Sequence, residues 1–499
     1  MPDALTARHS FSSIEFAMHF SIISKILGLL LMLFSLTMLP PIFVSLWYAD
    51  GSYAAFILAF GITLVTGAAA WFPVYTIKHE LSTRDGFLVT SLFWTVLALF
   101  GSLPFIIADA TQLSVVDAVF ESLSGLTTTG ATVITGLDHL PRALLYYRQQ
   151  LQWLGGIGII VIAVAILPML GIGGMQLYRA ETPGPVKNNK LTPRITETAK
   201  ALFLIYVSLT IACMLAYWAA GMNLFDAISH SFSTVAIGGF STHDASIGYF
   251  ESPTIMLICI IFMILSGVNF ALHFTAWRGR GLYHYFKDPE FQFYTSMIAI
   301  GTAITIAYLI HTETYDVTTS ILNGAFELVS ILTTTGFAVA DFSAWPTFLP
   351  YMIFWFAFLG GCAGSTGGGI KMIRVLLIIK QGMREIYRLI HPGAIIPIKV
   401  GKKTIPDRVI EAIWGFFAIY ILSYAAMCIV LLATGLNFVT AFTAVGACMN
   451  NLGPGLGDVA FHYADVNTTA KWVLCFAMLL GRLEVFTLLV LFTPMFWRR

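Results

Sequence analysis

A short segment that occurs twice constrains this chain more than any other feature. Leu-Thr-Thr-Thr-Gly stands at 126–130 and again at 332–336, each time after a short apolar segment. Two weaker copies keep the same frame, one ending at 236–239 and the other at 450–453. A segment repeated along one chain indicates a fold that is built from repeated structural units. Each copy ends in a glycine at the equivalent position, and these glycines are Gly130, Gly239, Gly336 and Gly453.

The composition excludes a water-soluble globular protein. The 499 residues are 58% hydrophobic and only 11% charged, against about 25% charged in soluble proteins. Many apolar runs reach the roughly 20 residues that a helix needs to cross a bilayer. The sequence therefore predicts an all-α polytopic membrane protein. The net charge of +1 gives no reason to expect a nucleic-acid partner, and the six cysteines have no CxxC spacing that would indicate a disulfide framework or a zinc site.

Around each copy we expect a spanning helix, a short re-entrant helix with its turn, and a second spanning helix. The fold class is thus four parallel helix–pore-loop–helix repeats around a pore, preceded by two extra spanning helices at 22–46 and 54–75. Spanning segments that close the repeats are expected at 151–170, 254–277, 349–380 (interrupted) and 472–496. The expected division is 1–80 (an N-terminal cytoplasmic tail and the extra pair), 81–180, 181–285, 286–400 and 401–499.

The short segments have only about a dozen residues before each turn, too few to span a bilayer. Non-helical backbone at membrane depth is tolerated where it lines a water-filled cavity or is buried in protein. Lys and Arg cluster in the loops between repeats, whereas the opposite loops carry mainly Asp and Glu. By the positive-inside rule the basic loops are cytoplasmic and the turns open to the outside.

The turns have the chemistry of a cation filter. An ion that leaves water exchanges its hydration shell for rings of backbone carbonyls, and glycine permits the positive φ that aligns successive carbonyls. Threonine hydroxyls would add ligands or hold the turn, and the C-terminal dipole ends of the short helices favour a cation. A glycine that merely stops a helix is the alternative for one copy, but not for four in register. The predicted metal-binding residues are Thr127, Thr128, Thr129, Gly130, Ala236, Ile237, Gly238, Gly239, Thr333, Thr334, Thr335, Gly336, Asn450, Asn451, Leu452 and Gly453.

A glycine-rich run interrupts the third repeat at 360–371. Each interior glycine costs a membrane helix about 1 kcal/mol against alanine, so we expect a flexible loop beneath the turns that blocks or clears the path. A passive kink is the alternative. A phosphate-binding loop is rejected, because Ile370 stands where the lysine must be. The predicted gate residues are Gly364, Ser365, Thr366, Gly367, Gly368, Gly369, Lys371 and Arg482.

Arg482 takes the place of a small residue found in the other three closing segments, at Gly156, Gly267 and Gly361. A charge at membrane depth usually faces the protein interior or water. It would set a barrier or anchor the glycine-rich loop, unless it is only a structural arginine satisfied by carbonyls or by Glu484.

Other polar residues of the short segments have simpler explanations. Glu121 and Glu327 occupy one position, where His230 and Ala444 stand in the other copies, so we expect packing or hydrogen bonding behind the turns. Asp117, Asp226 and Asn323 are expected to be N-caps of the short helices. No acid/base, nucleophile or metal-ligand constellation rises above chance, so an enzyme is not expected.

Together these motifs resemble the Trk/Ktr/HKT superfamily of potassium transporters, in particular its bacterial TrkH/TrkG subunits. The resemblance covers nearly the whole chain and includes Gln152-Trp-Leu-Gly-Gly at 152–156, Ala-Ile-Gly-Gly-Phe-Ser-Thr at 236–242, Gly-Ser-Thr-Gly-Gly-Gly-Ile-Lys at 364–371 and Asn-Leu-Gly-Pro-Gly at 451–455.

The resemblance implies potassium uptake across the bacterial inner membrane, with K⁺ as the transported ion and no organic cofactor. It also implies a homodimer in the lipid bilayer, an intramembrane gate formed by the glycine-rich loop and Arg482, and a cytosolic TrkA-type nucleotide-binding ring as partner. In this family, glycine at all four filter positions accompanies potassium selectivity, and serine at the first accompanies sodium transport. The alternatives left open are a Na⁺-selective or Na⁺-coupled transporter of the same fold and, more remotely, a polytopic membrane enzyme.

Overall fold

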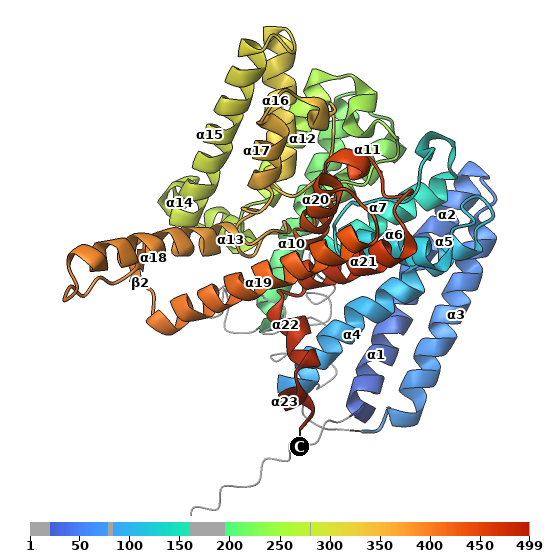
Figure 1. Cartoon of the computed structure of the whole chain (residues 1–499). Helices are drawn as coiled ribbons and strands as arrows, with labels where there is room; N and C mark the ends of the chain where they lie inside the picture. The colour runs from blue at the N-terminus through green and yellow to red at the C-terminus, as the bar shows by residue number, and fades with distance from the viewer. Residues whose placement is uncertain (1–19, 78–82, 157, 159–194, 280, 499) are drawn as a thin grey trace, which may run out of the picture.

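The computed structural model describes residues 20–77, 83–156, 158, 195–279 and 281–498 (Figure 1). Within them, six helices are long and apolar enough to cross a membrane, or eight if two bent pairs each count as one span. The expectation of a multi-pass helical membrane protein is therefore confirmed. The expected first closing segment, 151–170, lies largely outside the described residues.

The two extra helices pack against each other at the N-terminal end. They are α1 (Phe20–Ser35), continued through η1 (Leu36–Met38) into α2 (Leu39–Tyr48), and α3 (Tyr53–Trp71), which ends in η2 (Phe72–Val74). A Cβ on Gly28 would lie 2.7 Å from the Gly67 carbonyl oxygen, and one on Gly67 would lie 2.8 Å from that of Gly28. Small residues thus let the two backbones cross closely, as is common between membrane helices.

The rest of the described chain is also mainly helical. The elements of its first half are α4 (Thr83–Gly101), α5 (Leu103–Ile107), α6 (Val115–Leu126), η3 (Leu137–His139), α7 (Arg142–Gly156), α10 (Ile195–Ala219), α11 (Leu224–Ala236), η5 (Ser246–Phe250), α12 (Pro253–Ser266), α13 (Phe270–Arg278) and α14 (Tyr283–Lys287). Those of its second half are α15 (Pro289–His311), α16 (Val317–Leu332), η6 (Phe342–Ala344), α17 (Leu349–Phe356), α18 (Met372–Ile390), the hairpin β1 (Lys399–Val400) and β2 (Lys403–Thr404), α19 (Asp407–Ala433), α20 (Phe438–Met449), η7 (Gly457–Val459), α21 (Thr468–Arg482), α22 (Phe486–Leu489), η8 (Val490–Phe492) and α23 (Pro494–Trp497).

Two closing segments differ from the expectation of one straight span. The segment at 254–277 is bent by 93° between α12 and α13, and the segment at 472–496 by 112° between α21 and α22. At the first bend the Asn269 side chain accepts a hydrogen bond from the Ala271 amide at 2.8 Å and starts a new helix. At the second, Glu484 and Val485 have positive φ values of 53° and 24°, which an α-helix cannot contain.

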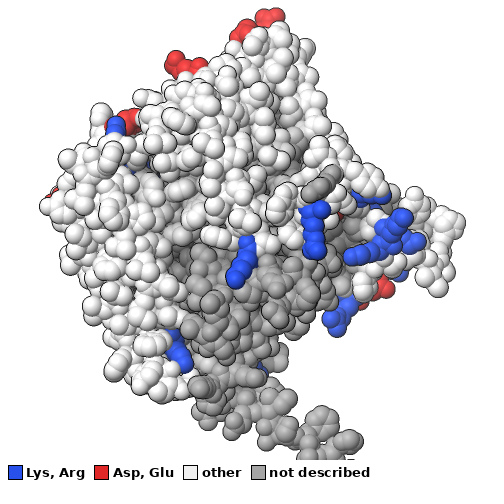
Figure 2. Space-filling view, turned by 180° about the vertical axis from the view of Figure 1, so that it is seen from behind, with Lys and Arg blue, Asp and Glu red and all other residues white. Residues whose placement is uncertain are grey.

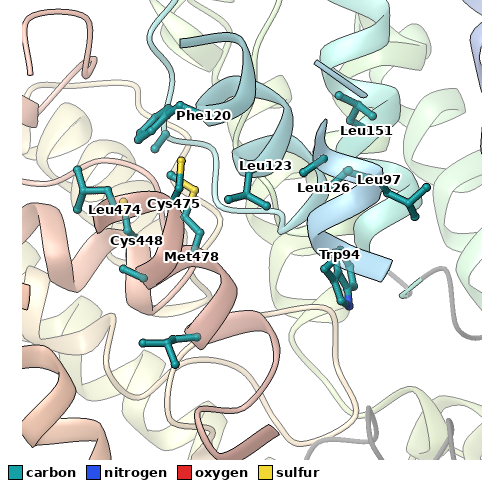
Figure 3. Packing of buried hydrophobic residues seen from close by; sticks show 14 of the residues in the cluster. Trp94, Leu97, Phe120, Leu123, Leu126, Leu151, Cys448, Leu474, Cys475 and Met478 are labelled. Atoms are coloured by element: carbon teal, nitrogen blue, oxygen red, sulfur yellow. The ribbon is translucent and has the colours of Figure 1, made fainter. Parts of the chain in front are cut away.

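The short helices α6, α11, α16 and α20 are buried over their C-terminal halves. Figure 3 shows part of the core around α6, where Phe120 and Leu123 lie near Cys448 of α20 and near Leu474, Cys475 and Met478 of α21. Segments from opposite ends of the sequence therefore share one core.

The N-caps of the four short helices are Ser114, Asn223, Asp316 and Asn437, so the helices begin earlier than expected. The N-cap assignments of Asp117, Asp226 and Asn323 were wrong.

Candidate ion pathway

The four turns share one backbone conformation. We call residues 127–130, 236–239, 333–336 and 450–453 turns 1 to 4. The second residue of each has a positive φ, 55° at Thr128, 56° at Ile237, 64° at Thr334 and 52° at Asn451. The closing glycines have φ values of 79°, 79°, 81° and 97° in the same order. Identical signs at identical positions indicate that the four turns present their carbonyls in a common pattern.

The turns also contact one another in a closed order. A Cβ on Gly130 would meet the Gly238 carbonyl oxygen of turn 2, and one on Gly239 or Gly336 would meet the corresponding carbonyl of the next turn. The circle closes where a Cβ on Gly453 would lie 2.7 Å from the Thr129 carbonyl oxygen of turn 1. The structure thus brings all sixteen predicted turn residues together in a ring. Glycine is required at these four positions by φ and by space at once.

The ring separates two cavities. The upper cavity is lined by all four glycines, by residues that follow the turns, including Ser241 and Tyr463, and by Arg148 of α7. The lower cavity is lined by Met449 and Asn451, by Arg482 and by Ser365, Gly367, Gly368, Gly369 and Lys371 of the glycine-rich loop. The ring thus lies between two hollows, as a filter in an ion pathway requires.

Threonine hydroxyls in the turns act mainly to hold the backbone. In turn 1, Thr127 Oγ1 donates to the Leu123 carbonyl at 2.7 Å and lies 2.8 Å from Thr129 Oγ1. Turn 3 repeats both contacts, with Thr333 bonded to the Val329 carbonyl at 2.7 Å and to Thr335 at 2.8 Å. We call this Thr–Thr contact the hydroxyl bridge. The threonines were expected either to bind the ion or to hold the turn. In turns 1 and 3 the geometry favours the second role.

The glycine-rich loop (360–371) is hydrogen-bonded to turns 3 and 4 and to the end of α11 just before turn 2. The Gly368 amide donates to Thr334 Oγ1 at 2.7 Å, and the Gly369 amide donates to the Asn450 carbonyl at 3.0 Å. Thr366 Oγ1 donates to the Val235 carbonyl, just before turn 2, at 3.0 Å. In this structure the loop therefore lies directly beneath the ring, and its backbone amides donate hydrogen bonds to polar groups of the turns.

Glu290 of α15 binds the backbone within this loop and at the start of α18, which follows it. Its Oε1 atom accepts hydrogen bonds from the Ala363 amide at 2.7 Å and from the Ile373 amide at 3.1 Å. Sequence reasoning missed this residue, because an acid beside Pro289 in the first turn of a helix is an ordinary complement to the helix dipole. Its distance from the loop in sequence left no local signal.

Arg482 lies beneath turn 1 and contacts the loop. Its Nη1 atom is 3.3 Å from Thr128 Oγ1 and 3.5 Å from the Thr366 carbonyl oxygen, and Nη2 donates to the carbonyls of Gly155 and Gly156. Glu484 forms an ion pair with Arg374 at 2.8 Å. Arg482 thus lies where it can both anchor the loop and place positive charge in the lower cavity.

Behind turn 1, Glu121 forms a buried ion pair with Arg148. Arg148 Nε donates to Glu121 Oε1 at 2.7 Å, and the two side chains are 1% and 0% exposed. Glu121 also accepts from the Val133 amide at 2.9 Å. The equivalent Glu327 accepts from the Val339 amide at 2.7 Å. Hydrogen bonding behind the turns is therefore confirmed for both glutamates. Arg148 was missed, because its place in α7 is fixed only by tertiary contacts.

Replacing Arg148 by methionine is expected to lower the free energy of unfolding by about 3–5 kcal/mol, because Glu121 would keep a buried charge without its partner. Thermal unfolding of the purified protein in detergent measures the change. Arg142→Met is the matched control, since Arg142 lies on the same helix but is exposed and rests on the Tyr48 ring. Equal melting temperatures for the two variants would contradict a structural role of the buried pair.

A histidine joins two loops at the upper cavity. His243 Nδ1 lies 2.5 Å from Asp138 Oδ1, Nε2 lies 3.4 Å from Asp226 Oδ2, and the ring stacks on Tyr249. Partial burial alone would lower the pKa of His243, but the two carboxylates outweigh it and raise that pKa. The charged form is therefore favoured, and it ties the loop after turn 1 to the loop after turn 2.

The fold and this pathway define a class: a polytopic helical membrane protein whose four turns form a ring between two cavities. The family model described as "TrkH: Cation transport protein" matches residues 52–499. The chain is 61% identical over 482 residues to the Trk system potassium uptake protein TrkH of Halomonas elongata, covering 97% of this chain and 100% of that protein. The Trk system potassium uptake protein TrkH of Escherichia coli K12 is 55% identical over 482 residues, which cover 96% of this chain and 100% of that protein. The crystal structure of the potassium transporter TrkH from Vibrio parahaemolyticus superposes with a TM-score of 0.88 at 55% identity, over 96% of this chain and 100% of that one.

The chain belongs to the TrkH family of cation transport proteins. It is a transporter and not an enzyme.

Proposed function

We propose that this protein takes up potassium through a channel-like pore in which turns 1 to 4 are the selectivity filter. The closed ring of turns carries the proposal, since four equivalent backbones with matching φ signs are suited to replace a hydration shell with carbonyl oxygens. The names of the relatives, Trk system potassium uptake proteins, support potassium as the ion. Glycine at all four closing positions supports K⁺ over Na⁺. Na⁺ selectivity or coupling is the second candidate.

In this proposal the loop at 360–371 is an intramembrane gate. Its hydrogen bonds to Thr334 and Asn450, and the Arg482 contacts with Thr128 and Thr366, hold a barrier directly beneath the filter. The gate residues are those expected from the sequence, Gly364 to Gly369, Lys371 and Arg482. Each of the four segments 81–180, 181–285, 286–400 and 401–499 would supply one side of the pore.

The distribution of charge supports a filter mouth that faces the periplasm across the bacterial inner membrane. Exposed acids such as Glu313 and Asp316 lie at the end of α15 and α16, and exposed Lys402 and Lys403 lie at the β1–β2 hairpin at the other side. Figure 2 shows acidic residues along the upper edge of the molecule and basic residues mostly lower down. The basic side would be cytoplasmic, and it would receive a TrkA-type nucleotide-binding ring, with the transporter itself a homodimer.

Uptake would follow the membrane potential, which supplies about 2.3 kcal/mol per charge for each 100 mV. Flux into vesicles that contain the purified protein tests the proposal. We expect K⁺ or Rb⁺ to enter and Na⁺ to compete poorly. No cation flux would overturn the transport proposal, and Na⁺ entry equal to that of K⁺ would favour the second candidate.

A further inference from the structure

Turn 2 lacks the hydroxyl bridge that holds turns 1 and 3. Ala236 and Gly238 stand where turn 1 has Thr127 and Thr129, so no side chain within turn 2 can form that bridge. Turn 2 nevertheless has the same positive φ values as its counterparts. A positive φ at Ile237, a β-branched residue, is unfavourable by itself. The Gly238 amide still donates to the Ser233 carbonyl at 2.8 Å, as its counterparts do in turns 1 and 3, but side-chain support like the hydroxyl bridge can come only from outside turn 2.

The amide of Gln152, on α7, fills the place of the missing side chain. A Cβ built on Gly238 would collide with the Gln152 side-chain amide. Gln152 Nε2 donates to the Gly238 carbonyl at 2.5 Å, and Gln152 Oε1 accepts from the Phe240 amide at 3.0 Å. The residue is fully buried. One side chain thus binds the backbone on both sides of Gly239, the closing glycine of turn 2.

The Gly238 carbonyl is also the group of turn 2 that packs against Gly130 of turn 1 in the ring. The direction in which Gln152 holds it therefore sets how turn 2 meets turn 1. Gln149, one turn earlier on α7, donates from Nε2 to the Phe240 carbonyl at 2.9 Å and supports the same segment.

We propose that Gln152 is a positioning residue that sets ion selectivity, by holding the turn 2 backbone in place of a hydroxyl bridge. This inference rests on the proposed function of the ring as a filter. A change at Gln152 alters the geometry of one quarter of the ring without touching the ion. It is expected to lower discrimination between K⁺ and Na⁺ more than it lowers the amount of folded protein.

Gln152→Met tests this, because methionine keeps most of the volume but makes neither hydrogen bond. The measurement is competition between Na⁺ and Rb⁺ for entry into vesicles containing the full-length protein. We expect the preference for Rb⁺ to fall about tenfold, a change of about 1.4 kcal/mol that is typical of a lost buried hydrogen bond. Gln150→Met is the matched control, since Gln150 is buried on the same helix but donates to the Thr37 carbonyl at 2.7 Å, away from the turns.

Gln152→Glu gives a readout that a purely structural role would not move, and it serves if the methionine variant does not fold. A glutamate still accepts from the Phe240 amide, but it can donate to the Gly238 carbonyl only when it is protonated. Its ion preference should therefore recover as the pH is lowered, while the parent preference stays constant over the same range. A parent protein without selective flux would overturn both the filter and this inference. A selective parent whose Gln152 variants keep the parent preference would overturn the role of Gln152 alone.

Discussion

Gly130→Ser is expected to abolish most of the discrimination between K⁺ and Na⁺. The added Cβ would collide with the Gly238 carbonyl oxygen, and the residue has a φ of 79°, a left-handed conformation that costs a residue with a side chain about 1–2 kcal/mol. Turns 1 and 2 must therefore separate, and the oxygen ring opens on one side. A fall in preference of about tenfold or more would follow from about 1.4 kcal/mol of altered ion binding.

The measurement is again competition between Na⁺ and Rb⁺ for entry into vesicles. Gly136→Ser isolates the role of the ring, because Gly136 has a similar φ of 73° but no atom lies within 4 Å of its built Cβ. It bears the same backbone strain in open space. Ion-competition curves for Gly130→Ser that match the parent would refute the assignment of turn 1 to the filter, and an equal loss in both variants would point to general destabilisation.

The ring itself could be predicted from sequence because its requirement is local. Only glycine tolerates both the φ and the close approach at Gly130, Gly239, Gly336 and Gly453, so a single residue type marks all four positions despite different neighbours. The glycine-rich loop could also be recognised in the sequence, because so many glycines would destabilise a membrane helix. Its hydrogen bonds to the turns are what the sequence could not show.

Bends and helix starts were less predictable. Apolar residues dominate on both sides of Arg482 and Glu484, so mean hydropathy favours one span, whereas the positive φ values of Glu484 and Val485 interrupt the helix. The N-caps of α6 and α11 are Ser114 and Asn223, three residues before the acids that were expected to cap these helices. An Asp in the first turn and a true N-cap both favour the helix dipole, and composition does not separate them.

The residues that support the ring were missed for a different reason. Gln152 lies 86 residues before the carbonyl that it binds, and Arg148 binds the Ser241 carbonyl across 93 residues. In the sequence both belong to a polar run on α7 that also contains Gln149 and Gln150, with nothing to tell which side chain faces which neighbour. Such long-range contacts follow from the packing of α7 against α11 and cannot be read from spacing.

Arg482→Ala is expected to raise basal flux about tenfold. Removing this side chain takes away a positive charge from the lower cavity and the contacts with Thr128 and the Thr366 carbonyl. A unit charge 4 Å from an ion contributes about 4 kcal/mol at an effective dielectric constant of 20. A tenfold rise needs only about 1.4 kcal/mol of that barrier, which allows for the compensating charge of Glu484 in the same cavity.

Arg482→Lys separates the charge from the hydrogen bonds, because lysine keeps the cation but lacks the planar fork that reaches several acceptors at once. If the electrostatic barrier dominates, the lysine variant should conduct like the parent and the alanine variant should conduct more. If anchoring of the loop dominates, both variants should conduct more, since neither holds the Thr366 and Gly155 carbonyls together. Parent-like flux from a well-folded alanine variant would leave Arg482 with a structural role only and would remove it from the gate. The comparison therefore distinguishes a charge beneath the filter from a tether of the loop.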